Sequence, residues 1–132
     1  MDYDQFVDLV AERANVSREQ AETLTAATLK TLAERITGGE ARDLAAQLPA
    51  RLASPLMPAE EEAEGFSLDE FIRRTAERAG TDRHTANIGM AAVMTTLREA
   101  VDRREFAHVM SQLPLEFREL APPPRIGRLD GN

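Results

Sequence analysis

The two side chains best placed for chemistry are Glu105 and His108, in the segment EFAH. A glutamate and a histidine three residues apart lie on one face of a helix. This E-x-x-H spacing is used by carboxylate-bridged di-metal bundles. Residues 40–43 read EARD, which supplies a second carboxylate beside another potential ligand. The spacing therefore raises one specific hypothesis, a metal-binding helical protein that uses Glu105 and His108.

The glutamates in these two segments also have a purely structural explanation. Glu40 follows Thr37 by three residues, and Glu105 follows Asp102 by the same distance. This is the spacing of a capping box at the start of a helix. A di-metal bundle also needs inward glutamates on two more helices, and we find none at suitable apolar positions. We therefore favour capping over metal binding and expect His108 at a helix surface.

Other reactive side chains lack the neighbours that catalysis requires. His84 is expected in the first turn of a helix, with no serine or cysteine nucleophile set beside it. The chain contains no cysteine, which excludes disulfides, thiolate metal sites and thiol catalysis. The segment TGGEA is too short for a phosphate-binding loop and lacks its lysine. We predict a protein that is not an enzyme and holds no cofactor.

A basic cluster marks the second half of the chain, and it consists of Arg73, Arg74, Arg78 and Arg83. One interpretation is a docking patch for an acidic partner or for nucleic acid. The other is a solvated face on which the arginines pair with nearby acids, namely Glu70, Glu77 and Asp82. Such surface pairs are common and individually weak, and we favour this second interpretation.

The elements that must position these side chains occur twice. Residues 2–58 align with residues 67–123 at an offset of 65 without a gap, and 18 of the 57 positions are identical. The segment AERA, for example, stands at residues 11–14 and again at 76–79. Shared helix caps, shared prolines and apolar residues at three-to-four spacing indicate helices throughout. The predicted fold is all-α, with two tandem four-helix repeats in which the second helix is long.

The expected helices and domain boundaries follow from these caps and breakers. The helices of the first repeat are expected at residues 3–14, 18–36, 38–47 and 49–53. Those of the second are expected at 68–79, 83–101, 103–112 and 114–120. The domain organisation is residues 1–58 for repeat 1, 59–65 for a solvated acidic linker, 66–123 for repeat 2 and 124–132 for a disordered tail. Proline and glycine with little to bury suggest the tail.

We expect the two repeats to share one core, because a unit of about 55 residues buries too little surface to be stable alone. Small residues in the long helices would let their axes approach closely, and they include Ala21, Ala26 and Ala27 with their counterparts Ala86, Ala91 and Ala92. Gly89 lies within the second long helix, where glycine is unfavourable. We predict that it marks a close contact with another backbone.

Composition narrows the class of protein further. The net charge is −7; residues 1–65 carry 13 acidic and 6 basic side chains, whereas residues 66–132 carry 10 of each. This balance does not favour nucleic acid or anionic lipid as a partner. The acidic start MDYDQF lacks the pattern of a signal peptide, and no apolar run is long enough to span a bilayer. We expect a cytoplasmic protein.

The whole pattern resembles a known family. The segments FVDLVAERANVSREQAE and LAERITGGEARDLAAQLP are similar to the bacterial family called domain of unknown function 2267. The resemblance covers roughly residues 3–121 and includes the second half as a diverged copy. It implies a small all-helical bacterial protein and no known activity. The helix pair at residues 6–36 also looks like the opening of histone-like DNA-bending proteins, but the basic arms and β-sheet of those proteins do not follow here.

These observations predict a small helical module that binds another protein and has no enzymatic activity. Two alternatives remain open at this stage. One is a nucleic-acid-associated accessory protein, whose binding would weaken steeply with salt. The other is the metal-binding protein based on Glu105 and His108.

Overall fold

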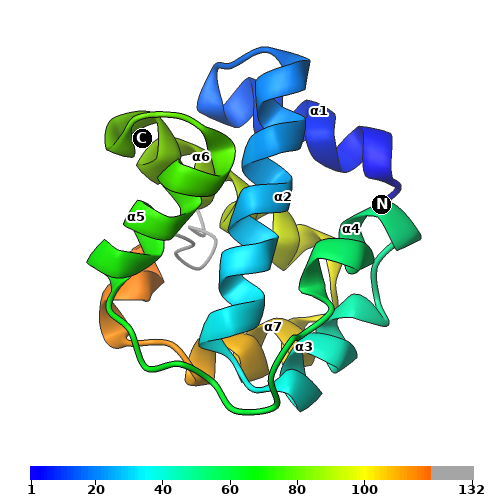
Figure 1. Ribbon diagram of the computed structural model, residues 1–132. Coiled ribbons are helices and arrows are strands. Elements are labelled where there is room, and N and C mark those ends of the chain that lie inside the picture. The colour runs from blue at the N-terminus through cyan, green and yellow to red at the C-terminus, as the bar shows by residue number, and fades with distance from the viewer. Residues whose placement is uncertain (120–132) are drawn as a thin grey trace, which may run out of the picture.

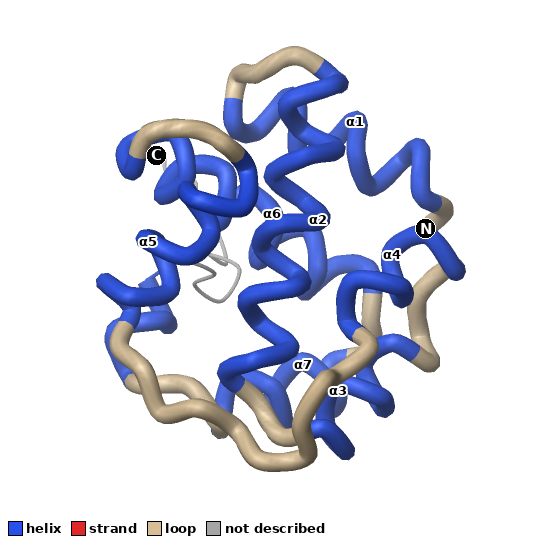
Figure 2. The backbone as a smooth tube through the Cα atoms, in the orientation of Figure 1, coloured by secondary structure: helices blue, strands red, loops and turns tan. Residues whose placement is uncertain are grey.

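A computed structural model describes residues 1–119 of the chain, and all of its regular elements are helices (Figures 1 and 2). The all-α prediction is therefore confirmed. The predicted tail at residues 124–132 lies outside the described residues. Figure 2 shows mostly short loops, with one longer segment that joins α4 to α5 along the lower edge of the molecule.

The helices lie close to their predicted positions. The first half contains α1 (Tyr3–Ala14), α2 (Arg18–Arg35), α3 (Gly38–Ala45), α4 (Ala50–Ala53) and the 3₁₀ helix η1 (Ser54–Leu56). The second half contains α5 (Leu68–Ala79), α6 (Arg83–Ala100), α7 (Arg103–Ser111) and the 3₁₀ helix η2 (Leu115–Glu119). Helix order and lengths in the two halves agree closely, and we call residues 65 positions apart matched residues.

Local sequence accounts for where the first helices begin and end. Asp2 and Ser17 each cap a helix with a complete capping box, formed with Gln5 and Gln20 respectively. Helix α1 ends at Asn15, whose φ of 56° is left-handed, and α5 ends at the matched Gly80 with a φ of 66°. Both residue types tolerate this conformation, which turns the chain back toward the next helix.

The two halves interlock and share one core. Helix α1 packs on α6 of the second half, α5 packs on α2 of the first, and α2 also crosses α6. At the lower end in Figure 1, α3 lies against α7. The contacts are thus reciprocal, as in an isologous interface between two subunits. Phe6 and Phe71 are completely buried within the single hydrophobic cluster that results.

The crossing of α2 and α6 is built from a large residue against a small one. A Cβ atom added to Gly89 would lie 2.7 and 2.8 Å from the two methyl carbons of Leu24 and 3.0 Å from its Cγ. Leu24 is the residue matched to Gly89. The close contact predicted at Gly89 therefore exists, but a side chain forms it rather than a backbone. Ala26 also differs from expectation, because it is exposed and does not pack between the helices.

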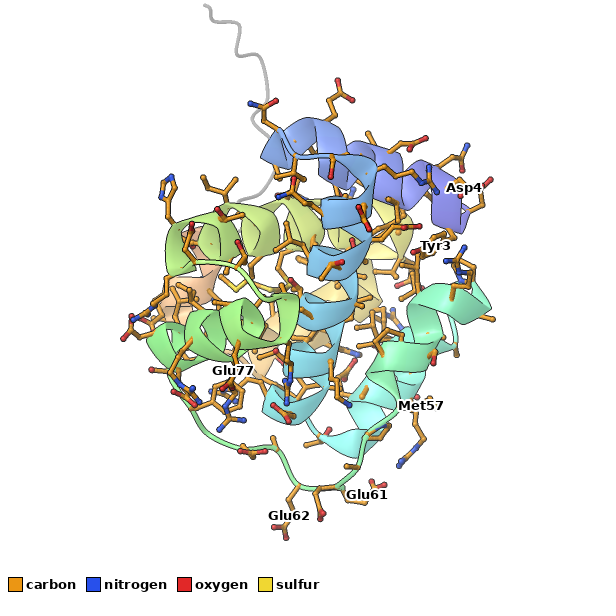
Figure 3. All side chains as sticks on the ribbon, turned by 45° about the horizontal axis from the view of Figure 1, so that its top comes forward. Tyr3, Asp4, Met57, Glu61, Glu62 and Glu77 are labelled. Atoms are coloured by element: carbon orange, nitrogen blue, oxygen red, sulfur yellow. The ribbon has the colours of Figure 1, made fainter. Side chains whose placement is uncertain are left out.

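The acidic linker is fastened to the first half rather than being a free connector. The amide of Gly38 donates to the carbonyl of Glu61 at 2.8 Å, and the amide of Glu64 donates to the carbonyl of Glu34 at 2.9 Å. A side chain at Gly38 would overlap Glu61, its Cβ lying 2.8 Å from Oε1 and 3.0 Å from Cα. The linker therefore requires glycine where it crosses the start of α3. Figure 3 shows Met57, Glu61 and Glu62 along this segment. Glu62 points away from the helices, whereas Glu61 pairs with Arg42 of α3.

Replacing Gly89 with alanine tests the large-to-small contact. We expect Gly89→Ala to lower the free energy of unfolding by about 1–3 kcal/mol, because the added methyl overlaps Leu24. In a Leu24→Ala background the overlap is gone, and the same change should stabilise by about 0.5–1 kcal/mol through helix propensity. Urea titration of the four proteins measures both effects. An equal effect of Gly89→Ala in the two backgrounds would show that Leu24 does not determine the contact.

The matched phenylalanines should make comparable contributions to the core. We expect Phe6→Ala and Phe71→Ala each to lower the free energy of unfolding by about 3–5 kcal/mol, since each removes a fully buried ring. Phe71 also packs edge-on against Phe117, with ring centroids 5.2 Å apart. Thermal melts check this expectation, and a variant that melts with the wild type would contradict it.

Candidate functional site

Glu40 and Glu105 lie together where α3 meets α7, and they do not form the capping boxes predicted for them. A capping box would use each glutamate to accept from the N-cap amide of its own helix. Here the amide of Thr37 donates instead to Oε1 of Gln112, and the amide of Asp102 donates to Oε1 of Gln47, both at 2.8 Å. Each half thus supplies the glutamine that satisfies the other half's cap. The two glutamates are left to face each other.

This carboxyl pair is arranged to hold a proton. One oxygen of each side chain, Oε2, is shielded from solvent and accepts no hydrogen bond from the described residues. Burial raises the pKa of Glu40, and so do the hydrogen bond that its protonated form can make with Glu105 and the negative charges of Glu105 and Asp43; together they bring it to about 7. Two adjacent carboxyls share a proton more readily than both ionise. At neutral pH the pair can therefore exchange one proton with solvent.

His108 lies at a helix surface, and the metal-binding hypothesis for it stays a prediction. His108 is exposed on α7, one helical turn beyond Glu105. Among residues 1–119, no three histidine, aspartate or glutamate side chains gather closely enough to hold a metal ion. The sequence hypothesis therefore singled out Glu105, but the ionisable side chain that lies beside it is Glu40 from the other half.

Two of the predicted patch residues join the halves. Arg78 on α5 donates from Nη1 to Thr31 Oγ1 and to Glu34 Oε1 on α2, both at 2.9 Å, and also binds Glu34 through Nη2. The matched Arg13 on α1 donates to Thr96 Oγ1 at 2.9 Å and to both oxygens of Glu99 at 2.8 and 2.9 Å. We call these two sets the arginine clamps. Arg74 adds a second bond to Glu34 at 3.0 Å.

Patch residues also pair with acids of their own half. Arg73 and Arg74 both donate to Glu70 at 2.8 Å, and their hydrogen bonds hold the pKa of that carboxyl down at about 2. Arg83 binds Asp69 rather than Asp82, which caps α6 instead. All four arginines of the predicted patch therefore have carboxylate partners, and a docking role for them stays a prediction.

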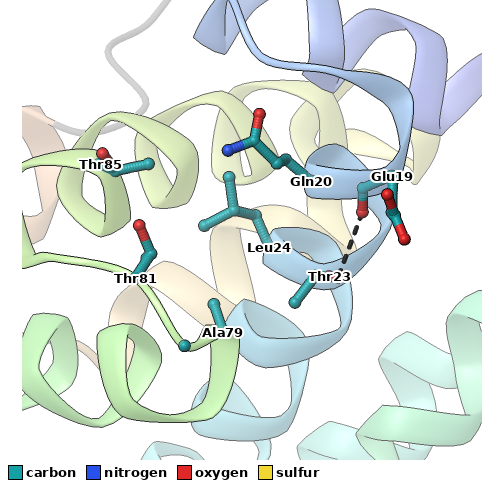
Figure 4. Close-up of a pocket in the computed structure, with 8 residues that line it drawn as sticks. Glu19, Gln20, Thr23, Leu24, Ala79, Thr81 and Thr85 are labelled. Carbon is teal, nitrogen blue, oxygen red and sulfur yellow. Dashed lines mark hydrogen bonds between the residues drawn. The ribbon is translucent and has the colours of Figure 1, made fainter.

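A cavity of about 250 Å³ opens between the start of α2 and the turn from α5 to α6 (Figure 4). Its polar lining comes from Gln20, Thr23, Thr81 and Thr85, with Glu19 at the edge and Leu24 in the middle. Gln20 already accepts from the amide of Ser17, and Thr23 donates to the carbonyl of Glu19. The cavity is below the roughly 300–1,000 Å³ of drug-sized ligand sites. Among the described residues that line it, there is no histidine and no pair of carboxylates.

The sequence contained a signal for the residues that join the halves. Each arginine clamp consists of an arginine, a threonine and a glutamate, and all three are identical in their matched positions. Gln47 and Gln112, which cap the opposite half, are identical as well. The sequence alone places Arg78 in a surface patch that docks a partner or pairs with nearby acids, because a pattern within one helix carries no information about polar contacts between the halves. The identities themselves pointed to a polar network that is used twice.

Removing one arginine clamp should weaken the interface between the halves. We expect Arg78→Gln to lower the free energy of unfolding by about 1 kcal/mol, because the paired bonds to Glu34 are only partly exposed to solvent. Arg73→Gln on the same helix is the matched control. Within residues 1–119 the ion pairs of Arg73 lie inside α5, and this substitution should cost about 0.5 kcal/mol or less. Urea titration compares them. A loss for Arg73→Gln as large as that for Arg78→Gln would contradict a special role for the clamp.

Comparison with known proteins places this fold in a family. No curated protein matches the chain. None of the helices within the described residues is long and apolar enough to cross a bilayer. The family model described as "Uncharacterized conserved protein (DUF2267)" matches residues 3–120, which is most of the chain. The protein therefore belongs to the DUF2267 family.

Proposed function

We propose that this protein is a non-enzymatic, cytoplasmic interaction module that binds a basic segment of another protein. The binding surface is the acidic linker face, which we define as Met57, Ala59, Glu60 and Glu62 over the adjoining groove. The groove also has Lys30, Ala33 and Pro55 in its lining. The observation that carries the proposal is the exposure of Met57, whose residue surface is 55% accessible within an acidic rim.

Ion pairs and backbone hydrogen bonds hold the linker in place, so that the acidic linker face stays exposed to solvent. Glu61 pairs with Arg42 and Glu64 pairs with Arg74, in addition to the backbone bonds of the same two residues. Among the described residues, Glu60 and Glu62 have no ion-pair partner. The segment is therefore anchored through Glu61 and Glu64, while Glu60 and Glu62 remain available to a cation. A preorganised surface loses less entropy on binding than a free linker would.

Charge and side-chain chemistry identify the class of partner. The first half with its linker carries all of the net negative charge of the chain. Such a field favours the approach of a positively charged segment and repels an acidic one. A flexible, polarizable methionine gives an apolar contact that adapts to different side chains. A basic segment that carries apolar residues meets both requirements.

We also propose that the scaffold arose from a duplicated helical unit. The 65-residue offset, the matching order of helices and the reciprocal clamps support this origin. The acidic residues of this face, Glu60 and Glu62, then belong to the part of the chain that has no counterpart in the duplication, and Met57 lies at the end of the first unit beside them. Function would reside in that connection, with the two units serving as its rigid support.

A designed peptide tests the proposed surface. The probe is a fluorescent 14-residue peptide of lysine and leucine, with a glutamate–leucine peptide of the same pattern as its control. We expect the full chain to bind the basic peptide only. The double variant Glu60→Lys/Glu62→Lys should bind it about ten-fold more weakly, which corresponds to about 1.4 kcal/mol. Met57→Ala should also weaken binding. Fluorescence anisotropy gives the dissociation constants.

The matched control separates the surface from net charge. Glu12→Lys/Glu77→Lys makes the same change in charge at two exposed helix positions away from the linker. We expect this variant to bind the basic peptide nearly as well as the wild type. Equal weakening by both double variants, or binding of the acidic peptide, would refute the acidic linker face as the site.

A further inference from the structure

The α3–α7 contact differs in kind from the other contacts between the halves. The arginine clamps join α1 to α6 and α5 to α2 through pairs of opposite charge. At α3 and α7 the bonds to the caps come from the neutral side chains Gln47 and Gln112. Among the described residues, Glu40 and Glu105 are the like-charged pair that meets there. This end of the interface therefore contains a potential repulsion, and the charges that act on Glu40 are acidic.

Among the described residues, the charges that act on Glu40 come from acidic groups. Helix α3 packs against α7, α2, α4 and η1, and α7 packs against α3 and α6. On α3, Asp43 adds negative charge to Glu40, and Arg42 is engaged by Glu61. On α7, Arg104 acts on Asp102, while Arg103 and His108 are exposed. On α2, Arg35 donates to the carbonyls of Phe66 and Gln112, and on α4 the guanidinium of Arg51 lies over the ring of Tyr3. The groups that act on Glu40 are thus both acidic, namely Glu105 and Asp43.

A single proton removes the repulsion. When one carboxyl is protonated, its O–H donates to the other carboxylate and uses an acceptor that otherwise has no partner. A hydrogen bond to an ionised acceptor is stronger than one between neutral groups. When that proton leaves to water, two negative charges face each other and each shielded oxygen lacks a donor. An unsatisfied, partly buried charge is costly.

We propose that Glu40 and Glu105 form a proton-operated latch between α3 and α7. The latch is closed when the pair holds one proton. It opens when the proton is lost, while the arginine clamps keep α1, α2, α5 and α6 together. In the neutral pH range the protein thereby has a closed and an open form of the α3–α7 contact, while the rest of the fold stays intact.

The sign of the pH dependence follows from the raised pKa. The folded chain holds the proton of Glu40 up to a pH of about 7, whereas an ordinary glutamate in the unfolded chain loses it near 4.5. Between these values the folded state binds more protons than the unfolded state. The contribution to stability is therefore full below about 4.5, falls as the pH rises and is lost above about 7.

Carboxyl NMR and amide hydrogen exchange on the full chain test the latch. We expect the Glu40 carboxyl to titrate with a midpoint near 7. After correction for intrinsic rates, protection of the α3 and α7 amides should fall about ten-fold from pH 6 to pH 8, because a group with a pKa near 7 goes from about nine-tenths to about one-tenth protonated over this range. Protection in α1 and α5 should remain unchanged. The melting temperature of the wild type should fall relative to that of Glu40→Gln from pH 5 to pH 7.

Glutamine variants and controls decide the interpretation. A carboxamide donates without a titrating proton, so Glu40→Gln and Glu105→Gln should each remove the pH dependence of exchange in α3 and α7. Glu12→Gln changes an exposed glutamate elsewhere and should retain it. Histidines ordinarily titrate near this range, so His108→Asn is included and should also retain it. Titration of Glu40 near 4.5, pH dependence that persists in both glutamine variants, or its loss in His108→Asn would each overturn the proposal.

Discussion

Arg13 and Arg78 each reach from one half of the chain to a threonine and a glutamate on the long helix of the other. The rest of the structure depends on this exchange. A unit of about 60 residues buries only about 60% of the surface its unfolded chain exposes, and alone it is marginally stable. The clamps fix the angle at which α1 meets α6 and α5 meets α2. Phe6 and Phe71 are then enclosed in one core instead of two incomplete ones.

The two ends of the interface serve different purposes because their chemistry differs. Charge-assisted bonds at the clamps do not depend on pH near neutrality, since arginine stays protonated. The α3–α7 end relies on amide side chains and on a proton between two carboxyls. A fold that combines a permanent attachment with a titratable one can move locally while its core persists.

Much of this fold could be predicted from the sequence, because caps and breakers act locally. Asp2, Ser17, Asn15 and Gly80 determine helix ends through their own side chains or backbone, without help from distant residues. The assignment of Glu40 and Glu105 to capping boxes failed for the opposite reason. Glutamines more than fifty residues away occupy the cap amides, and a pattern within one helix contains no information about them. The same limit concealed the partner of Gly89, whose space is filled by Leu24.

The contacts that hold the linker could likewise be predicted only in part. Its glutamates were predicted to be solvated, and Glu61 and Glu64 are indeed exposed, yet both also form ion pairs. The glycine at position 38 was a usable signal, because the matched residue is Arg103 and the linker crosses the chain at Gly38. The acidic rim of Glu60 and Glu62 could be read as a charge cluster, but the exposure of Met57 beside it required the fold.

The large-to-small contact between Leu24 and Gly89 also governs how separate molecules can combine. If two chains exchanged halves, each first half would still meet a second half, and the contact would be preserved in both assemblies. Pairing two first halves would bring two leucines to one point, and pairing two second halves would leave a void between two glycines. The arginine clamps are the same in both halves and would permit two identical halves to pair. The shapes of Leu24 and Gly89 at this crossing disfavour such pairing.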